Sequence, residues 1–193
     1  MTDNRKLDAK HYINEENYPA ALELIMKILD ENPDDPDALF LFGEVAVKQD
    51  KRGLAYNMFR RCAAINPDSA AIWVNYGRSQ PDTPEGWQAS LDCFMRALAI
   101  DSKNVAAMSN IATLYIQNTQ PTEAKIWAKR CIKIAPDYQP GLNALAFAYL
   151  MLGKWEKGWK LYENMLGSKY RHDIHYSGVP LWDGTPGETV IVY

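Results

Sequence analysis

The chain has 193 residues, of which 47% are hydrophobic and 23% charged, and its formal net charge is -3 at pH 7. This length has room for one elongated repeat domain and a short appendage. The slightly acidic balance argues against a nucleic-acid partner, because proteins that bind the phosphate backbone usually carry a basic patch. The polar start argues against a signal peptide, and the longest apolar stretch, residues 142–152, is too short to span a bilayer. We therefore expect a cytoplasmic protein with no membrane partner.

One arrangement of large and small residues returns about every 34 residues along most of the chain. Three of its columns are Gly43, Gly77, Ala112 and Ala146; Ala55, Ser90, Ala124 and Gly158; and Phe59, Phe94, Ala128 and Tyr162. A fixed period of this length is typical of a helical solenoid, in which helix pairs bury their apolar faces by stacking on one another. We predict five such pairs, in residues 2–35, 36–69, 70–104, 105–138 and 139–167.

The first pair begins with an unusually polar helix, which suits an end cap whose outer face meets water. Only Leu7, Ala9, Tyr12 and Ile13 are expected to face inward there. In the following pairs, small residues such as Gly43 are expected where two antiparallel helices approach closely. Prolines that lack an amide donor are expected to stop the second helices, and they are Pro33, Pro67 and Pro136.

The third pair departs from the pattern between its helices. Its turn carries one extra residue together with Pro81 and Pro84, and Gln80 stands where the first helix should continue. We expect a shortened first helix and a protruding turn. The turn is either a tolerated insertion or a contact loop, since irregular loops carry function more often than regular ones.

The fourth pair is regular, and the fifth is rich in aromatic residues. Trp159 and Tyr162 lie three residues apart, on one face of the expected second helix. We expect them to pack against the fourth pair and whatever follows, rather than to form a ligand cage.

The repeated pattern resembles the tetratricopeptide repeat family. The residues that carry the resemblance are Leu39, Phe42 and Gly43; Trp73, Tyr76 and Gly77; Met108, Ile111, Ala112 and Tyr115; and Leu142, Leu145, Ala146 and Tyr149. It covers about five-sixths of the chain. It implies an all-α, right-handed superhelical solenoid, and a non-catalytic scaffold that binds a peptide or protein segment in a concave groove.

The same resemblance implies that the first helix of each pair lines this groove. The expected groove residues are Phe40, Glu44, Val47, Lys48, Asn75, Arg78, Asn110, Thr113, Gln117, Asn143, Phe147, Leu150 and Met151. Phe147, Leu150 and Met151 would form an apolar cluster too large to leave in water. A partner, a second copy or the chain's own tail should cover it, and the tail is the favoured cover, through Val179, Leu181 and Trp182.

Two subfamilies suggest different ligands for the groove. Repeats that bind chaperones clamp a terminal carboxylate with basic residues, which Phe40 and Glu44 replace here. Repeats of protein O-GlcNAc transferases grip extended peptide backbone with a ladder of asparagines, whose amides both donate and accept hydrogen bonds. Asn75 and Asn110 occupy the same repeat position, and Asn143 is one residue out of register.

The tail breaks the period from about Ser168. It reads as a loop, a turn at residues 184–187 and a strand at residues 188–193. A lone strand is not stable by itself, so it should pair with something else. The stretch from GKWEKGWKLYENML through PLWDG to ETVIVY resembles the junction in bacterial and phage repeat proteins that continue into a two-Rossmann (GT-B) glycosyltransferase-like domain. This implies an alternative function as the substrate-recruiting arm of such a protein, with catalysis beyond Tyr193.

Catalytic and metal-binding patterns are weak. Cys62, Cys93 and Cys131 lack CxxC spacing and are expected to be small core residues in a reducing compartment. His172 and His175 form an HxxH pair in the tail, where we expect them to be solvated. No residue set resembles a nucleophile with its base or a phosphate loop, so no catalytic residue, metal or cofactor is expected. Self-association through the end repeats or the tail is a further possibility.

Overall fold

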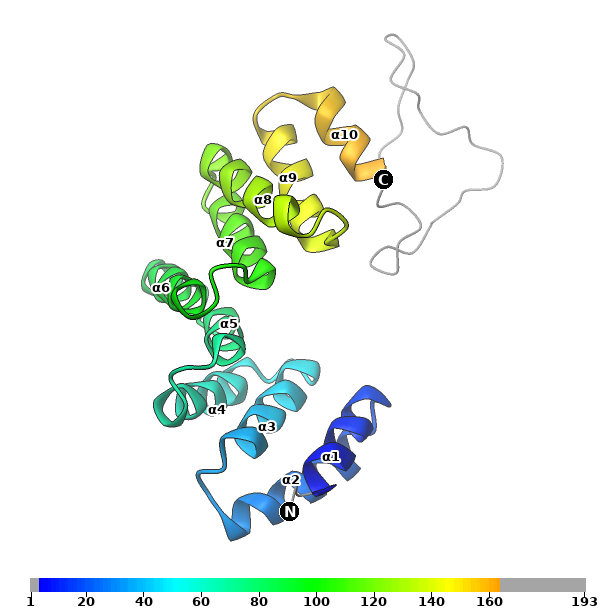
Figure 1. Ribbon diagram of the computed structural model, residues 1–193, viewed down its shortest axis with the longest axis vertical. Coiled ribbons are helices and arrows are strands. Elements are labelled where there is room, and N and C mark those ends of the chain that lie inside the picture. The colour runs from blue at the N-terminus through cyan, green and yellow to red at the C-terminus, as the bar shows by residue number, and fades with distance from the viewer. Residues whose placement is uncertain (1–3, 164–193) are drawn as a thin grey trace, which may run out of the picture.

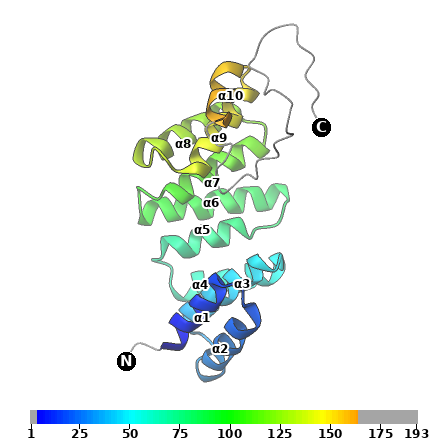
Figure 2. The ribbon, with the colours of Figure 1, turned by 90° about the vertical axis from the view of Figure 1, so that its right-hand side faces the viewer.

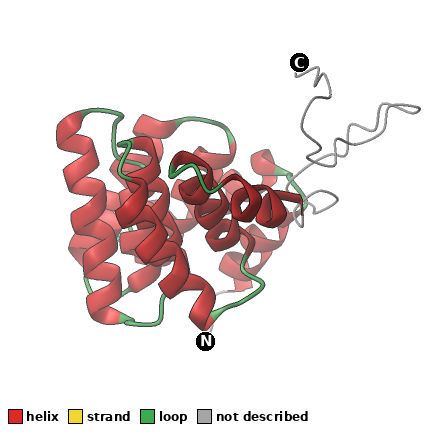
Figure 3. Cartoon of the chain, turned by 90° about the horizontal axis from the view of Figure 1, so that it is seen from above, coloured by secondary structure: helices red, strands yellow, loops and turns green. Residues whose placement is uncertain are grey.

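The computed structural model describes residues 4–163, which form ten helices and, within that range, no strand (Figures 1 and 3). The helices are α1 (Asn4–Asn14), α2 (Tyr18–Glu31), α3 (Pro36–Lys48), α4 (Arg52–Ile65), α5 (Ala70–Arg78), α6 (Pro84–Ile100), α7 (Val105–Gln117), α8 (Pro121–Ile134), α9 (Gln139–Met151) and α10 (Trp155–Glu163). The predicted all-α solenoid of helix pairs is confirmed for these residues. The tail from residue 168, with its predicted strand and HxxH pair, lies outside them.

The helices stack into a crescent that runs from α1 at one end to α10 at the other (Figure 1). The first helices of the middle pairs, α3, α5, α7 and α9, lie on the inner side, and α4 and α6 lie on the outer side. Seen from the inner side, the successive helices lie roughly one above another along the long axis (Figure 2). The fold therefore presents one long concave face built from the first helices.

Local sequence signals set the helix bounds. Asp35 and Asn104 cap α3 and α7, and each side chain accepts a 2.9 Å hydrogen bond from a backbone amide three residues on. Three of the second helices, α2, α4 and α8, end two residues before Pro33, Pro67 and Pro136, where the predicted stops lie. Each pair is thus delimited by its own sequence before any packing between pairs.

Small residues lie where the helices approach most closely, as predicted. A Cβ atom added to Gly43 would come within 2.6 Å of the Phe59 ring, and one added to Gly77 within 2.6 Å of the Phe94 ring. Real Cβ contacts are not this short, so each glycine admits the aromatic residue of the second helix in its own pair. Alanines fill the corresponding positions of the fourth pair, and Ala112 and Ala128 are both fully buried.

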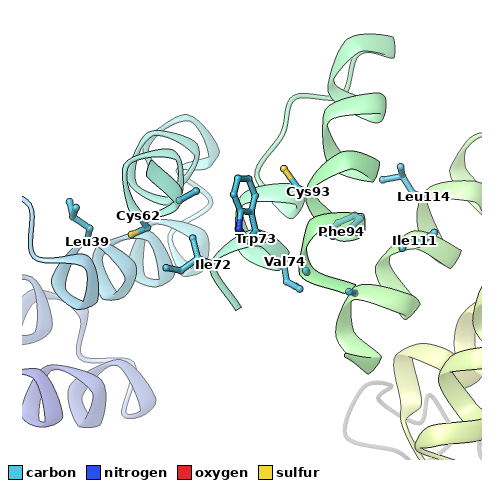
Figure 4. Packing of buried hydrophobic residues seen from close by; sticks show 12 residues of the cluster. Leu39, Cys62, Ile72, Trp73, Val74, Cys93, Phe94, Ile111 and Leu114 are labelled. Atoms are coloured by element: carbon cyan, nitrogen blue, oxygen red, sulfur yellow. The ribbon is translucent and has the colours of Figure 1, made fainter. Parts of the chain in front are cut away.

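A continuous apolar core connects the second, third and fourth pairs (Figure 4). Its buried members include Leu39, Cys62, Ile72, Trp73, Val74, Cys93, Phe94, Ile111 and Leu114. Trp73 is anchored at its polar edge, because its indole Nε1 donates a 2.7 Å hydrogen bond to the Pro67 carbonyl. The core therefore bridges the repeats, as expected of helix pairs that cannot bury their apolar faces alone.

The three cysteines are buried free thiols, as predicted. Burial raises the pKa of Cys62 to about 12, and that of Cys93 and Cys131 to about 11. The Cys62 and Cys131 thiols lie at equivalent repeat positions, and each donates to a carbonyl of the preceding helix, from 3.4 Å. In residues 4–163 no cluster of three His, Cys, Asp or Glu side chains could hold a metal ion. No helix of that segment is both long enough and apolar enough to cross a bilayer.

The first pair is tied to the second by ion pairs. Lys6 Nζ lies 2.8 Å from Asp35 and 2.9 Å from Asp37, which flank the start of α3. Ala9 and Ile13 are buried as predicted, but the prediction for Leu7 is wrong, because its side chain is 64% exposed. Leu7 stands one repeat before Leu41, and no helix precedes α1 within the described residues to cover it.

Candidate functional site

Helix α5 is the irregular element of the inner face. It has nine residues, whereas α3, α7 and α9 each have thirteen. The predicted shortening of the third pair's first helix is therefore confirmed, and about one helical turn is missing at its C-terminal end.

The turn that replaces it is folded back onto the start of α6. Ser79 Oγ donates to the Tyr76 carbonyl from 2.8 Å, and the Thr83 amide donates to the Pro81 carbonyl from 2.9 Å. A Cβ atom on Gly86 would overlap the Pro81 carbonyl oxygen, so only glycine fits there without a shift. Residues 81–85 are exposed, as the predicted protrusion requires, but the base of the turn is held by these contacts.

A hollow of about 980 Å³ opens where the last turn of α5 is missing. Its walls come from the end of α3, the start of α4, α5 and its turn, α6 and α7. Six of the predicted groove residues line it together: Val47, Asn75, Arg78, Asn110, Thr113 and Gln117. We call this hollow, with these six residues, the central groove.

The two asparagines of the central groove are held in the same way. Asn75 Nδ2 donates to the Ala71 carbonyl from 3.1 Å, and Asn110 Nδ2 donates to the Ala106 carbonyl from 2.8 Å. Each bond joins a side chain to the carbonyl four residues earlier in its own helix. One amide hydrogen is thereby committed, and the oxygen and the second hydrogen of each amide are left to face other groups.

Other predicted groove residues lie elsewhere. Phe40 packs against Phe59 of its own pair, at 5.6 Å between ring centroids, and against the core that the pair shares with the third. Asn143 occupies the same repeat position as Phe40 and lies on α9, no residue of which lines the central groove. Leu150 is half-buried, and a Cβ atom on Gly158 would lie 2.6 Å from it, so it packs against α10.

Two predicted residues mark the C-terminal end of the concave face. Phe147 and Met151 are 45% and 43% exposed. The Phe147 ring lies 6.0 Å from the Tyr162 ring in an edge-to-face arrangement, and Trp159 lies 5.5 Å from the same tyrosine. Trp159 therefore packs within its own pair. The predicted cover of this patch, residues 179–182, lies outside the described range.

Charged residues lie toward the N-terminal end of the concave face. Glu44 is half-buried on α3 beside Lys10 and Lys48. Burial raises the pKa of the Glu44 carboxyl, and the two lysines oppose that rise without cancelling it. Neither Glu44 nor Lys48 lines the central groove.

Among the residues lining the central groove that the sequence did not predict are Asp50, Arg52 and Trp87. They come from a turn and from the second helices α4 and α6, whereas the resemblance pointed to first helices. Trp87 is fixed by a 3.2 Å hydrogen bond from its Nε1 to the Leu114 carbonyl. The extra residue and the two prolines of the third pair were the signal that could have drawn attention to them.

The crescent of helix pairs and its concave groove define a helical repeat solenoid, a fold shared with solved tetratricopeptide repeat structures. Residues 105–138, which hold α7 and α8, match the tetratricopeptide repeat family. Among curated proteins, the chain is 25% identical over 166 residues to the DnaJ homolog subfamily C member 7 homolog of Schizosaccharomyces pombe, covering 78% of this chain and 35% of that protein. It is 22% identical over 122 residues to the human mitochondrial import receptor subunit TOM70, covering 63% of this chain and 20% of that protein.

Solved structures share the fold over most of the chain. TTC0263, a thermophilic TPR protein of Thermus thermophilus, superposes with a TM-score of 0.72 at 19% identity, covering 87% of this chain and 91% of its own. YrrB, a TPR protein with an unusual peptide-binding site, superposes with a TM-score of 0.63 at 14% identity, covering 89% and 88%. The chain spans about a third or less of the length of the curated relatives that it matches.

Proposed function

We propose that this chain is a non-catalytic scaffold whose central groove binds an extended segment of another protein. The observation that carries the proposal is the groove itself, about 980 Å³ in volume, where six residues predicted from the repeat pattern converge. An extended segment suits it because Asn75 and Asn110 offer amide groups at the same position of successive repeats. Peptide groups present donors and acceptors at regular intervals, and amides can pair with both.

The size of the hollow supports the same conclusion. Ligand pockets for small molecules occupy roughly 300–1,000 Å³ and enclose most of their ligand. This hollow is at the upper end of that range and open along the concave face, which suits a chain segment with one or two inserted side chains. The similarity in fold to YrrB, which has a peptide-binding site, and in sequence to an import receptor subunit is in keeping with this role.

The experiment is selection from a displayed library of random 12-residue peptides on the full 193-residue chain. We expect a family of related peptides, with binding confirmed by fluorescence anisotropy of synthetic copies. Thr113→Trp places a large ring in the groove and should weaken binding at least tenfold. Thr122→Trp makes the same change at an exposed position on α8, outside the groove, and should leave binding unchanged.

Two outcomes would overturn the proposal. One is the absence of any enriched peptide family. The other is enriched peptides whose affinity Thr113→Trp leaves intact, because they would bind elsewhere on the chain. Circular dichroism of both tryptophan variants establishes that each is folded, which is expected because both threonines are exposed.

The remaining expectations stay as proposals of lower rank. The glycosyltransferase-arm alternative rests on residues from 168 onward, outside the described range. Self-association is supported, within that range, by apolar side chains exposed toward the two ends of the crescent. They are Leu7 on α1 and Phe147 and Met151 on α9. A cytoplasmic location accords with the free thiols of the three buried cysteines.

A further inference from the structure

Charge is distributed very unevenly between the inner and outer helices of the third to fifth pairs. Helices α7 and α9 contain no charged residue in thirteen positions each, and α5 contains one, Arg78. The outer helix α8 alone carries five charged side chains, which are Glu123, Lys125, Lys129, Arg130 and Lys133. Over three successive repeats, the inner helices therefore carry a single ionised side chain, Arg78.

Arg78 lies in the central groove and is exposed. The other charged side chains that line the groove lie close to one another: the Arg52 guanidinium is 3.8 Å from Asp50 and 3.7 Å from Asp82. Arg78 forms no ion pair within residues 4–163. A planar guanidinium with five donors is well suited to a carboxylate, which it can bind through two parallel hydrogen bonds.

The surroundings of Arg78 change character toward the C-terminal end of the concave face. On α7 the neutral polar side chains of Asn110, Thr113 and Gln117 line the same groove. Two helices further on, the exposed groups are the apolar side chains of Phe147 and Met151. A charged group of a ligand placed along α7 or α9 would lose water without gaining an opposite charge, which is costly.

We propose that the concave face recognises an extended segment with one acidic side chain, which pairs with Arg78, followed by uncharged residues that become apolar where they meet Phe147 and Met151. This inference rests on the proposed function and specifies the chemistry of its ligand. The acidic residue sets the position of the segment at the missing turn of α5. The uncharged remainder of the face rejects segments that carry further charge.

The test is the same displayed library, selected in parallel on the unmodified full-length chain and on Arg78→Glu. Peptides selected on the unmodified chain should contain one Asp or Glu followed by uncharged residues. Peptides selected on Arg78→Glu should carry Lys or Arg at that place instead. A synthetic acidic peptide should bind Arg78→Glu about tenfold to a hundredfold more weakly, as expected when one partner of a charged contact is reversed.

The matched control is Arg60→Glu, which reverses the charge at an exposed position of the outer helix α4. It should leave the preference for acidic peptides unchanged. Enriched peptides that lack an acidic residue, or that keep it on Arg78→Glu, would overturn this inference. The proposed function would still stand if Thr113→Trp weakens their binding at least tenfold. Failure to enrich any family would overturn both. Replacement of the peptide's Asp by Asn should reproduce the loss seen with Arg78→Glu.

Discussion

The two halves of the concave face are built differently. In the C-terminal half, α7 packs directly along α9, and the two helices have equal length. In the middle of the molecule, α3 and α5 scarcely meet, although each outer helix still packs against the first helix of the next pair. The loss of one turn from α5 therefore opens a hollow without interrupting the stack. In this solenoid the outer helices maintain continuity, and the inner helices are free to vary.

The largest expected effect comes from the aromatic residue beneath the open region. Phe94 is 1% exposed, packs against Gly77 and contributes to the wall of the central groove. Phe94→Ala should lower the free energy of unfolding by about 3–5 kcal/mol, because it leaves a cavity in the core that bridges three pairs. Urea titration followed by circular dichroism measures the change.

Phe147→Ala is the matched substitution in the closely packed half. Its side chain is 45% exposed, so its removal should cost about 1 kcal/mol, roughly half the transfer free energy of a buried ring. Equal costs for the two variants would contradict the view that the stack continues beneath the hollow.

The second prediction concerns the glycine that holds the irregular turn. Gly86→Ala should destabilise the chain by about 2–3 kcal/mol, because the added Cβ would overlap the Pro81 carbonyl and force the turn away from α6. Gly53→Ala, near the start of α4, has no atom within 4 Å of the added Cβ and should stabilise by about 0.5–1 kcal/mol. Thermal unfolding measures the change in stability for each variant. The two changes should have opposite signs if the turn is held against α6, and the same sign if it is not.

Much of this architecture could be predicted from the sequence, because the repeat makes each helix pair a test of the others. The small residues Gly43 and Gly77 identify close contacts by their recurrence. The shortening of α5 follows from Gln80 and Pro81, which stand where the other pairs continue their first helix. Local chemistry of this kind acts within one pair and needs no knowledge of its neighbours.

Placement of the groove residues was less predictable, because it depends on the rotation of each helix against the next pair. One position along a helix rotates a side chain by about 100°. Phe40 packs into the core, whereas Asn75 and Asn110, whose repeat position is one residue further along, line the groove. Trp87 enters the groove only because the last turn of α5 is absent, a consequence that no single repeat reveals.

The third prediction concerns a variant in which the hollow should be closed. Replacing Ser79–Gly86 with the seven residues Leu114–Gln120 of the fourth pair removes the extra residue and both prolines. Helix α5 should then extend by about one turn, and binding of the selected acidic peptide should fall about tenfold. Anisotropy measures the affinity, and hydrogen exchange over residues 70–82 reports the longer helix. Unchanged affinity with a longer helix would show that the irregular turn is a tolerated insertion.

The smallest expected effect concerns Glu44 and tests whether water reaches the open half of the concave face. Burial raises the pKa of its carboxyl above the usual value of 4.5, against the opposing effect of Lys10 and Lys48. The folded state then holds the proton more tightly than the unfolded state, so this group's contribution to stability is complete below pH 4.5 and is lost as the pH rises through the folded value. Glu44→Gln should remove that loss and stabilise the chain at pH 7 by less than about 1 kcal/mol.

Asp35→Asn should change the pH dependence of stability in the opposite direction. Burial favours the neutral form of Asp35, but hydrogen bonds from Lys6 and the Ala38 amide prevail and hold the pKa of this carboxyl below its usual 3.8. Its contribution is present above pH 3.8 and is lost as the pH falls through the folded value. Urea titrations at pH 4 and pH 7 should therefore show that Glu44→Gln gains relative to the unmodified chain as the pH rises, and that Asp35→Asn loses. A Glu44→Gln variant with no such gain would mean that water reaches this carboxylate, and that the open half of the face is hydrated up to α3.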